Sequence, residues 1–174
     1  MNRILVVVDM QNDFIDGALG TKEAVAIVDR VKSIIDSFEG KIIFTRDTHT
    51  EEYLETSEGR NLPVIHCVKD THGWQISGKL DTTRALCIID KPVFGSLELS
   101  QILLNEDKKE KVDEIVLIGL CTDICVISNA MIAKAALYES KITVDAAACA
   151  GVTPESHERA LEAMKMCQIN VING

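Results

Sequence analysis

The sequence predicts an α/β fold in which a mainly parallel sheet lies between layers of helices. Short runs rich in β-branched residues alternate along the chain with longer segments of helical periodicity. Most of the short runs are continuously apolar, which is typical of parallel strands buried on both faces. No repeat, linker or low-complexity stretch interrupts this order, so residues 1–174 are expected to form a single domain.

The expected elements follow one another in a regular order. The six candidate strands span residues 4–8, 41–45, 86–89, 114–118, 141–144 and 168–172. The four candidate helices span residues 22–37, 97–105, 122–138 and 154–166. Thr153 and Pro154 are typical of a helix start, and Gly40 is typical of a helix end. Residues 48–79 match neither pattern, and long irregular segments of α/β domains often carry functional residues.

Composition and charge exclude several functional classes. Apolar residues make up 47% of the chain and charged residues 26%, the balance of a globular protein. The net charge of −9 disfavours nucleic acids and anionic membranes as partners, because both require basic surfaces. No apolar run reaches the roughly 18 residues of a membrane span, and none resembles a signal peptide, so a cytoplasmic location is expected. The six scattered cysteines give little support to a four-cysteine metal site.

Ionisable side chains follow four of the expected strands. In chain order these are Asp9, then Asp47 and His49, then Lys91, then Cys121 and Cys125. In open parallel sheets, ligands bind at the carboxyl ends of the strands. These side chains are therefore expected to meet at one edge of the sheet.

Cys125 is the candidate nucleophile. It lies at a strand-to-helix transition, where unpaired N–H groups lower the pKa of a thiol and can stabilise an oxyanion. A buried apolar cysteine would produce the same local pattern, so both interpretations stay open from the setting alone. Asp9 is either a base or a loop carboxylate, and Lys91 is either its counter-charge or a surface lysine. Together the three would form a nucleophile, its base and an electrostatic organiser.

A second group of residues suggests a metal site. Asp47 and His49 are alternate residues of an extended segment, so their side chains can grip one ion. His66 could complete a set of two histidines and one carboxylate, and Glu58 could add an oxygen. Such a set suits zinc, iron or manganese. Polar loop residues with capping roles are the alternative interpretation of the same spacing.

Five segments, spread over nearly the whole chain, carry a resemblance to a known family. They are residues 9–14, 45–49, 62–68, 91–96 and 119–126. In that order they resemble the DxQxDF signature, the metal-binding segment, the second metal histidine, the catalytic-lysine loop and the nucleophile segment of nicotinamidase and isochorismatase-like cysteine hydrolases. The last segment, Gly-Leu-Cys-Thr-Asp-Ile-Cys-Val, is the most specific.

The resemblance implies a three-layer α/β/α fold with a six-stranded, mainly parallel sheet, the isochorismatase-like hydrolase fold. It implies a cis peptide bond between Leu120 and Cys121. Asp9, Lys91 and Cys125 would be the catalytic residues. The N–H groups of Cys121 and Cys125 would form the oxyanion hole.

The resemblance also implies a metal ion and a substrate. One divalent metal ion, with zinc favoured and iron or manganese as alternatives, would be held by Asp47, His49, Glu58 and His66. Because the metal site marks nicotinamidases within the family, the expected reaction converts nicotinamide to nicotinate and ammonia through a thioester on Cys125. Residues in contact with the substrate would be Phe14, Leu62 and Leu120. Leu62 and Pro63 stand where nicotinamidases usually have an aromatic residue, which leaves room for another small amide.

Several other functions compete with this hypothesis. A related cysteine hydrolase could act on a carbamoyl or ureido compound. A haloacid dehalogenase-type phosphatase needs a second aspartate where Gln11 stands. Non-haem iron oxygenases use antiparallel barrels, and a non-catalytic relative would not need Asp9, Lys91 and Cys125 intact. The expected partner is a small-molecule amide, and a homo-oligomer is expected because relatives often oligomerise.

Overall fold

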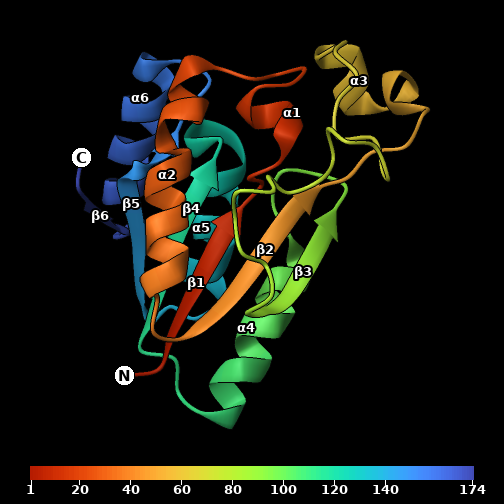
Figure 1. The fold of residues 1–174 in the computed structure, drawn as a ribbon. Coiled ribbons are helices and arrows are strands. Elements are labelled where there is room, and N and C mark those ends of the chain that lie inside the picture. The colour runs from red at the N-terminus through yellow and green to blue at the C-terminus, as the bar shows by residue number, and fades with distance from the viewer.

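The chain forms three layers, with a six-stranded sheet between helices, and this confirms the predicted fold class (Figure 1). The computed structural model describes residues 1–174. All neighbouring strands pair in parallel, in the order β3-β2-β1-β4-β5-β6. The strand bounds are β1 Arg3–Val8, β2 Lys41–Asp47, β3 Ala85–Lys91, β4 Glu114–Leu120, β5 Lys141–Ala150 and β6 Asn170–Ile172.

The helices divide unequally between the two faces of the sheet. The bounds are α1 Asn12–Ile15, α2 Lys22–Ser37, α3 Ser57–Asn61, α4 Leu97–Lys109, α5 Ile127–Ala136 and α6 Pro154–Met166, with a 3-10 turn at Tyr53–Glu55 and a π-helical turn at Thr122–Val126. α2 packs on one face, whereas α4, α5 and α6 pack on the other. α1 and α3 lie beyond the carboxyl ends of the strands (Figure 1). None of the helices has both the length and the apolar character that a membrane crossing needs.

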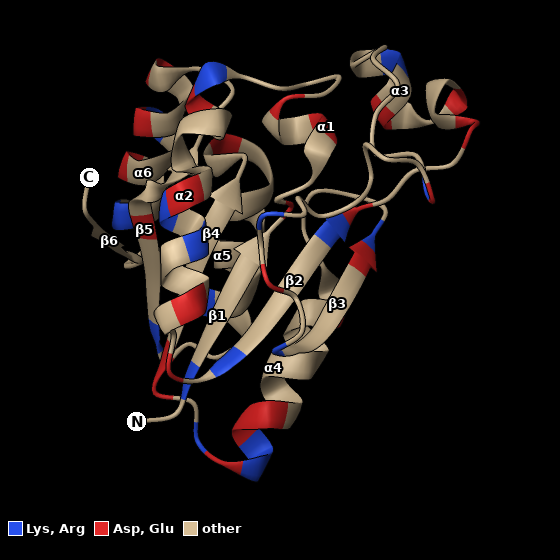
Figure 2. Ribbon diagram, viewed as in Figure 1, with Lys and Arg blue, Asp and Glu red and all other residues tan.

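The central strands are buried on both faces. In β1, Ile4, Val6 and Val8 belong to the core that includes α4, α5 and α6, while Leu5 and Val7 belong to the core that includes α2. This alternation follows from the two-residue period of a strand. Burial of each such side chain stabilises the fold by roughly 1.5–3 kcal/mol. Two-sided burial therefore explains why this run of the sequence is continuously apolar. Figure 2 accordingly shows the charged residues mainly at strand ends and on the helices.

The structure differs from the predicted elements mainly at their ends. β5 continues to Ala150, past the predicted end at residue 144, because its pairing with β4 resumes after a register shift. β6 begins at Asn170 because the N–H of Gln168 still bonds to the last turn of α6. The helix predicted over residues 122–138 begins as the π-helical turn and ends at Ala136. α4 extends past residue 105, where Glu106 pairs with Lys41 and Lys109.

Gly119, near the end of β4, allows close approach of β1 and β4. Its φ of 117° lies in the left-handed region that favours glycine. A Cβ atom at this position would lie only 2.1 Å from the carbonyl oxygen of Val8. The close pairing of β1 and β4 at Gly119 therefore depends on the absence of a Cβ atom in glycine.

We expect Gly119→Ala to lower the free energy of unfolding by about 3 kcal/mol or more, because strain and a clash with a neighbouring strand add together. Urea denaturation would measure the loss. Gly78→Ala is the matched control, since a Cβ atom at Gly78 would meet nothing within 4 Å. Equal unfolding midpoints for the two variants would contradict the prediction.

Candidate active site

The strand order places four strand ends around one crevice. The chain first extends from β1 to β2 and later pairs β4 on the other side of β1, which makes the β1–β4 boundary a topological switch point. Asp9 directly follows β1, and Cys121 directly follows β4. β2 ends at Asp47, and β3 ends at Lys91. The polar residues expected at one edge of the sheet do lie there.

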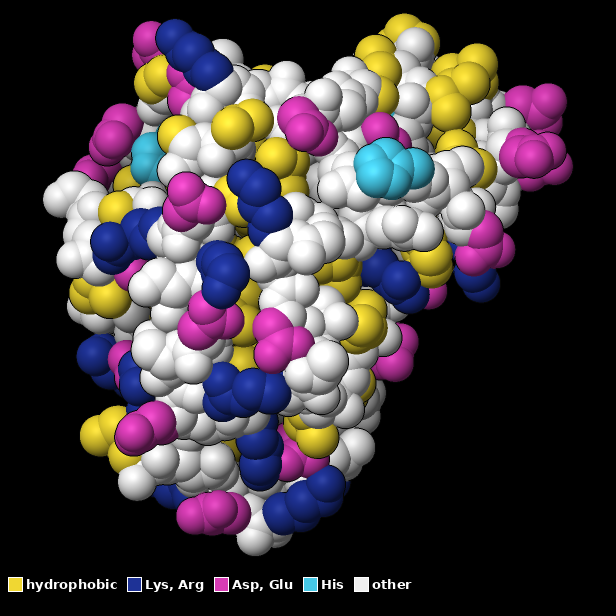
Figure 3. All heavy atoms as spheres, in the orientation of Figure 1, with side chains coloured by type: hydrophobic (Ala, Val, Ile, Leu, Met, Phe, Trp, Pro, Cys, Tyr) yellow, Lys and Arg dark blue, Asp and Glu magenta, His cyan; other side chains and the backbone are white.

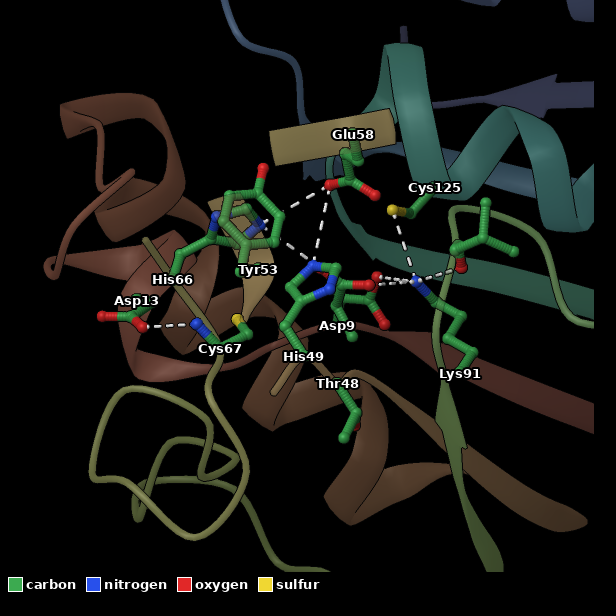
Figure 4. Close-up of polar contacts among 12 residues, drawn as sticks. Asp9, Asp13, Thr48, His49, Tyr53, Glu58, His66, Cys67, Lys91 and Cys125 are labelled. Atoms are coloured by element: carbon green, nitrogen blue, oxygen red, sulfur yellow. Dashed lines mark hydrogen bonds and ion pairs between the residues drawn. The ribbon is translucent and has the colours of Figure 1, made fainter. Parts of the chain in front are cut away.

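Asp9, Lys91 and Cys125 meet at this crevice (Figure 4). The Lys91 Nζ atom lies 2.6 Å from Asp9 Oδ2 and 3.5 Å from Cys125 Sγ. It also donates to the carbonyl oxygen of Val93 at 3.2 Å. Asp9 and Lys91 are almost completely buried, and Cys125 is only 4% exposed. The ammonium therefore joins the thiol and the carboxylate in a largely buried site.

Burial and neighbouring charges set the protonation of these groups. Burial raises the pKa of the Cys125 thiol well above its ordinary value, and the Asp9 charge adds to the rise, although the Lys91 charge opposes it. Burial also raises the pKa of the Asp9 carboxyl against the effect of Lys91. Burial lowers the pKa of Lys91, but the charges of Asp9 and Cys125 raise it by more, so the amine stays protonated. The resting thiol therefore needs a base beside it to become a nucleophile.

The turn that carries Cys125 is unusual in its backbone. The peptide bond between Leu120 and Cys121 is cis, as the resemblance implies. The N–H groups of Ile124 and Val126 both donate to the carbonyl oxygen of Cys121, which forms the π-helical turn. The N–H of Cys121 forms no hydrogen bond within the protein. This free donor and the N–H of Cys125, which lies within the π-helical turn, are the groups expected to bind an oxyanion.

The four predicted metal ligands also lie together. One ligand atom from each of Asp47, His49, Glu58 and His66 falls within 4.8 Å of all the others. Asp47 Oδ2 lies 2.8 Å from His49 Nε2 and 3.4 Å from His66 Nε2, and Glu58 Oε1 lies 3.6 Å from His49 Nε2. Burial raises the pKa of Asp47, but hydrogen bonds from both histidines lower it by more, so this carboxylate is ionised.

Two details of this group fit a divalent cation. His66 Nδ1 lies 2.7 Å from the carbonyl oxygen of Val64, which can only accept a hydrogen bond, so the Nδ1–H donates and Nε2 faces the other ligands. Asp47 Oδ1 is buried without a hydrogen-bond partner, and its nearest charged neighbour is the Lys91 ammonium at 3.5 Å. Nitrogen and carboxylate donors are those that zinc, iron and manganese prefer. The residues therefore suit such an ion.

A cavity of about 190 Å³ lies in front of Cys125 and reaches the metal-ligand group. Phe14, Leu62 and Leu120, the predicted substrate contacts, all line it. The charged residues of its lining are both acidic, Asp47 and Glu58, and the rest of the lining is mostly apolar. Hydrophobic side chains also gather on the lobe that carries α3, which borders the hollow at the top of the molecule (Figure 3). The cavity therefore suits a small, neutral and largely apolar molecule.

Sequence reasoning overlooked two side chains that hold the segments of the predicted metal ligands. Gln11 grips the backbone of Asp47, because its Oε1 accepts from the Asp47 N–H at 2.7 Å and its Nε2 donates to the Asp47 carbonyl at 2.8 Å. Asp13 Oδ2 accepts from the N–H of Cys67 at 2.7 Å, directly after His66. Both residues stand in the DxQxDF segment, which was the available signal.

Thr45 and Tyr53 were also overlooked. Thr45 stands in the segment 45–49 that carries part of the resemblance, whereas the sequence carried no signal for Tyr53. The Thr45 hydroxyl donates to Asp9 Oδ1 at 2.7 Å and fixes the orientation of that carboxylate. Tyr53 is fully buried, its ring lies 4.6 Å from the His49 ring, and its hydroxyl donates to the Leu62 carbonyl. Phe94, on the segment after Lys91, is a further cavity residue outside the predicted set.

The chain matches known proteins along its whole length. It is 28% identical to the nicotinamidase/pyrazinamidase of Mycobacterium tuberculosis over 98% of both chains. It is 25% identical to the nicotinamidase of Saccharomyces cerevisiae over 98% of this chain and 99% of that protein. The structure matches the pyrazinamidase of Pyrococcus horikoshii in complex with zinc at a TM-score of 0.83, with 30% identity and 100% of both chains covered. Residues 3–174 match the Isochorismatase domain, so the chain belongs to the isochorismatase family.

Proposed function

We propose that this protein is a nicotinamidase, which hydrolyses nicotinamide to nicotinate and ammonia through a thioester on Cys125. Its homologues and its Isochorismatase domain support the broader class, an amide hydrolase. One observation carries the narrower proposal. A single small cavity contains the Cys125 thiol, 3.5 Å from the Lys91 ammonium, together with Asp47 and Glu58 of the metal-ligand group.

Asp9 and Cys125 carry the proposed chemistry. Asp9 takes the thiol proton, and the sulfur attacks the amide carbon to form a C–S bond. The N–H groups of Cys121 and Cys125 donate to the oxygen that gains the carbonyl electron pair. As the C–N bond breaks, Asp9 returns the proton to nitrogen and ammonia leaves.

Hydrolysis of the thioester uses the same groups. Asp9 takes a proton from water, whose oxygen forms a bond to the acyl carbon while the C–S bond breaks. Asp9 then returns the proton to the Cys125 sulfur, and nicotinic acid leaves and loses its carboxyl proton to solvent as nicotinate. Throughout both steps, Lys91 remains charged and holds Asp9 and Cys125 on either side of its ammonium.

Asp47, His49, Glu58 and His66 are the residues that would hold a divalent metal ion, with zinc favoured. When bound, the ion supplies an electrophilic centre for a lone pair of the substrate or of water. Phe14, whose ring lies 5.5 Å from that of His66, would pack on the substrate ring, with Leu62 and Leu120 completing the wall.

The proposal is tested by incubating the purified protein with nicotinamide and measuring the release of ammonia and nicotinate. Carbamoyl and ureido compounds, and an amide that carries a carboxylate, are tested in parallel. Nicotinamide should be turned over, and the anionic amide should be the poorest substrate, because both charged residues of the cavity lining are acidic. Turnover of a carbamoyl or ureido compound without any turnover of nicotinamide would reject the nicotinamidase assignment and leave the hydrolase class intact.

We expect metal removal to weaken substrate binding more than it changes the reactivity of the Cys125 thiol. Chelation, or His49→Ala, should raise KM for nicotinamide at least about tenfold, since a metal contact of roughly 1.4 kcal/mol or more is lost. The alkylation rate of Cys125 should change far less, because the Lys91 and Asp9 contacts do not involve His49. Metal content per chain would be recorded in each sample. An unchanged KM after complete metal removal would contradict the prediction.

A further inference from the structure

Asn129 is a buried polar residue in the helix that follows the nucleophile. It has no exposed surface, whereas the other buried residues of α5 are the alanines Ala130 and Ala133. Asparagine forms helices less readily than alanine, and a buried amide costs free energy unless its polar atoms are hydrogen-bonded. The presence of an amide here therefore suggests a role beyond filling space.

The Asn129 amide joins two parts of the chain. Its Oδ1 accepts from the N–H of Ser96 at 3.0 Å, and its Nδ2 donates to the carbonyl oxygen of Phe94 at 3.0 Å. The same Nδ2 donates to the carbonyl oxygen of Cys125 at 2.8 Å. Both donor hydrogens are used, so the side chain is fixed in one orientation. One amide thus connects the segment after β3 with the turn of the nucleophile.

That segment carries two groups of the proposed active site. Lys91 begins it, and the Val93 carbonyl accepts from the Lys91 ammonium. Phe94 lines the cavity. At Gly95 the segment packs so closely on α5 that a Cβ atom would lie 2.6 Å from Ile132 Cδ1. The position of the ammonium relative to the sulfur therefore depends on how residues 91–96 sit on α5.

We propose that Asn129 is a positioning residue, which holds residues 91–96 against α5 and so keeps the Lys91 ammonium beside the Cys125 sulfur. This inference rests on the proposed function, because that function gives Lys91 and Cys125 their roles. Asn129 forms no hydrogen bond with the reacting sulfur and does not line the cavity. Its effect is transmitted through the backbone of Phe94, Ser96 and Cys125.

The test compares Asn129→Ala with Asn129→Asp in the full-length protein. The aspartate keeps the size and an acceptor for the Ser96 N–H, but it lacks the amide donors. Both variants should lower kcat for nicotinamide by about 10- to 100-fold and change KM much less, because small misplacements of a reacting group cost up to about 100-fold in rate. A second measurement is iodoacetamide labelling of Cys125 relative to exposed Cys167, followed by peptide mass spectrometry. The ratio should fall several-fold in both variants.

Leu103→Ala is the control for stability alone, because Leu103 is fully buried in α4 and does not line the cavity. It should lower the melting temperature without changing the labelling ratio. The proposal would be overturned if folded Asn129→Ala kept the labelling ratio and kcat of the native protein. It would also be overturned if Asn129→Asp alone kept both values, since the amide donors would then be dispensable. If the native protein does not hydrolyse nicotinamide, the substrate proposal fails, whereas the labelling ratio still decides the role of Asn129.

Discussion

Cys125→Ala is expected to lower kcat for nicotinamide by at least about a thousandfold. The proposed route has no other nucleophile. Removal of the nucleophile from a catalytic triad typically lowers kcat more than substitution of a residue that does not touch the substrate. The variant should stay folded, because alanine fits the space of the buried thiol. Ammonia release at saturating nicotinamide would measure the loss.

Cys167→Ala is the matched control, because it removes an exposed thiol that does not line the cavity. It should retain native activity. In the native protein, acid quench during turnover should also trap a nicotinoyl adduct on the peptide that contains Cys125, detected by mass spectrometry. A Cys125→Ala variant with more than a tenth of native activity would show that the sulfur is not the nucleophile.

Asp9→Asn should lower kcat by about 10²- to 10⁴-fold, the usual contribution of a positioned general base. The substitution preserves the shape of the side chain and an acceptor for the Thr45 hydroxyl. It removes the proposed acceptor of the thiol proton, while burial keeps the pKa of that thiol high. Steady-state rates and the melting temperature would be recorded together, because the Lys91 charge also loses its nearest partner.

The pH dependence gives a separate check on Asp9. The carboxylate acts as a base only when it is ionised, so native kcat should fall as the pH drops through its raised pKa. This acid limb should be missing from the residual rate of Asp9→Asn. Asp145→Asn is the control, since Asp145 is buried and paired with Arg30 but does not line the cavity. If Asp145→Asn reduced kcat as much as Asp9→Asn, lost stability would explain both results.

Much of this architecture could be predicted because it depends on neighbouring positions in the sequence. A continuous apolar run indicates a buried strand, and the residues that follow the run mark the end of that strand. The run before Asp9 and the run before Cys121 are each buried on both faces, so their composition alone indicates parallel strands. The carboxyl ends of such strands share an edge, which brings Asp9, Lys91 and Cys125 together without knowledge of side-chain contacts. The ligand group at Asp47 followed from spacing together with the family resemblance.

Other features depend on contacts between distant parts of the chain. The need for glycine at position 119 arises only where β4 meets Val8, and the π-helical turn arises only where the backbone closes on Cys121. Asn129 looks like an ordinary helix residue until its amide meets residues 94–96. Hydrogen bonds of this kind have no periodicity, and a single sequence therefore gives no sign of them.

The irregular segment 48–79 is attached to the sheet through contacts that are far apart in sequence. Asp13 holds Cys67, and Gln11 bonds to the carbonyl of Trp74. Because such closures are formed only after the intervening chain has been ordered, they belong to the non-local interactions that slow folding. We therefore expect residues 48–79 to open locally before the sheet does, so that native-state hydrogen exchange would find their amide hydrogens exchanging while β1 and β4 stay paired.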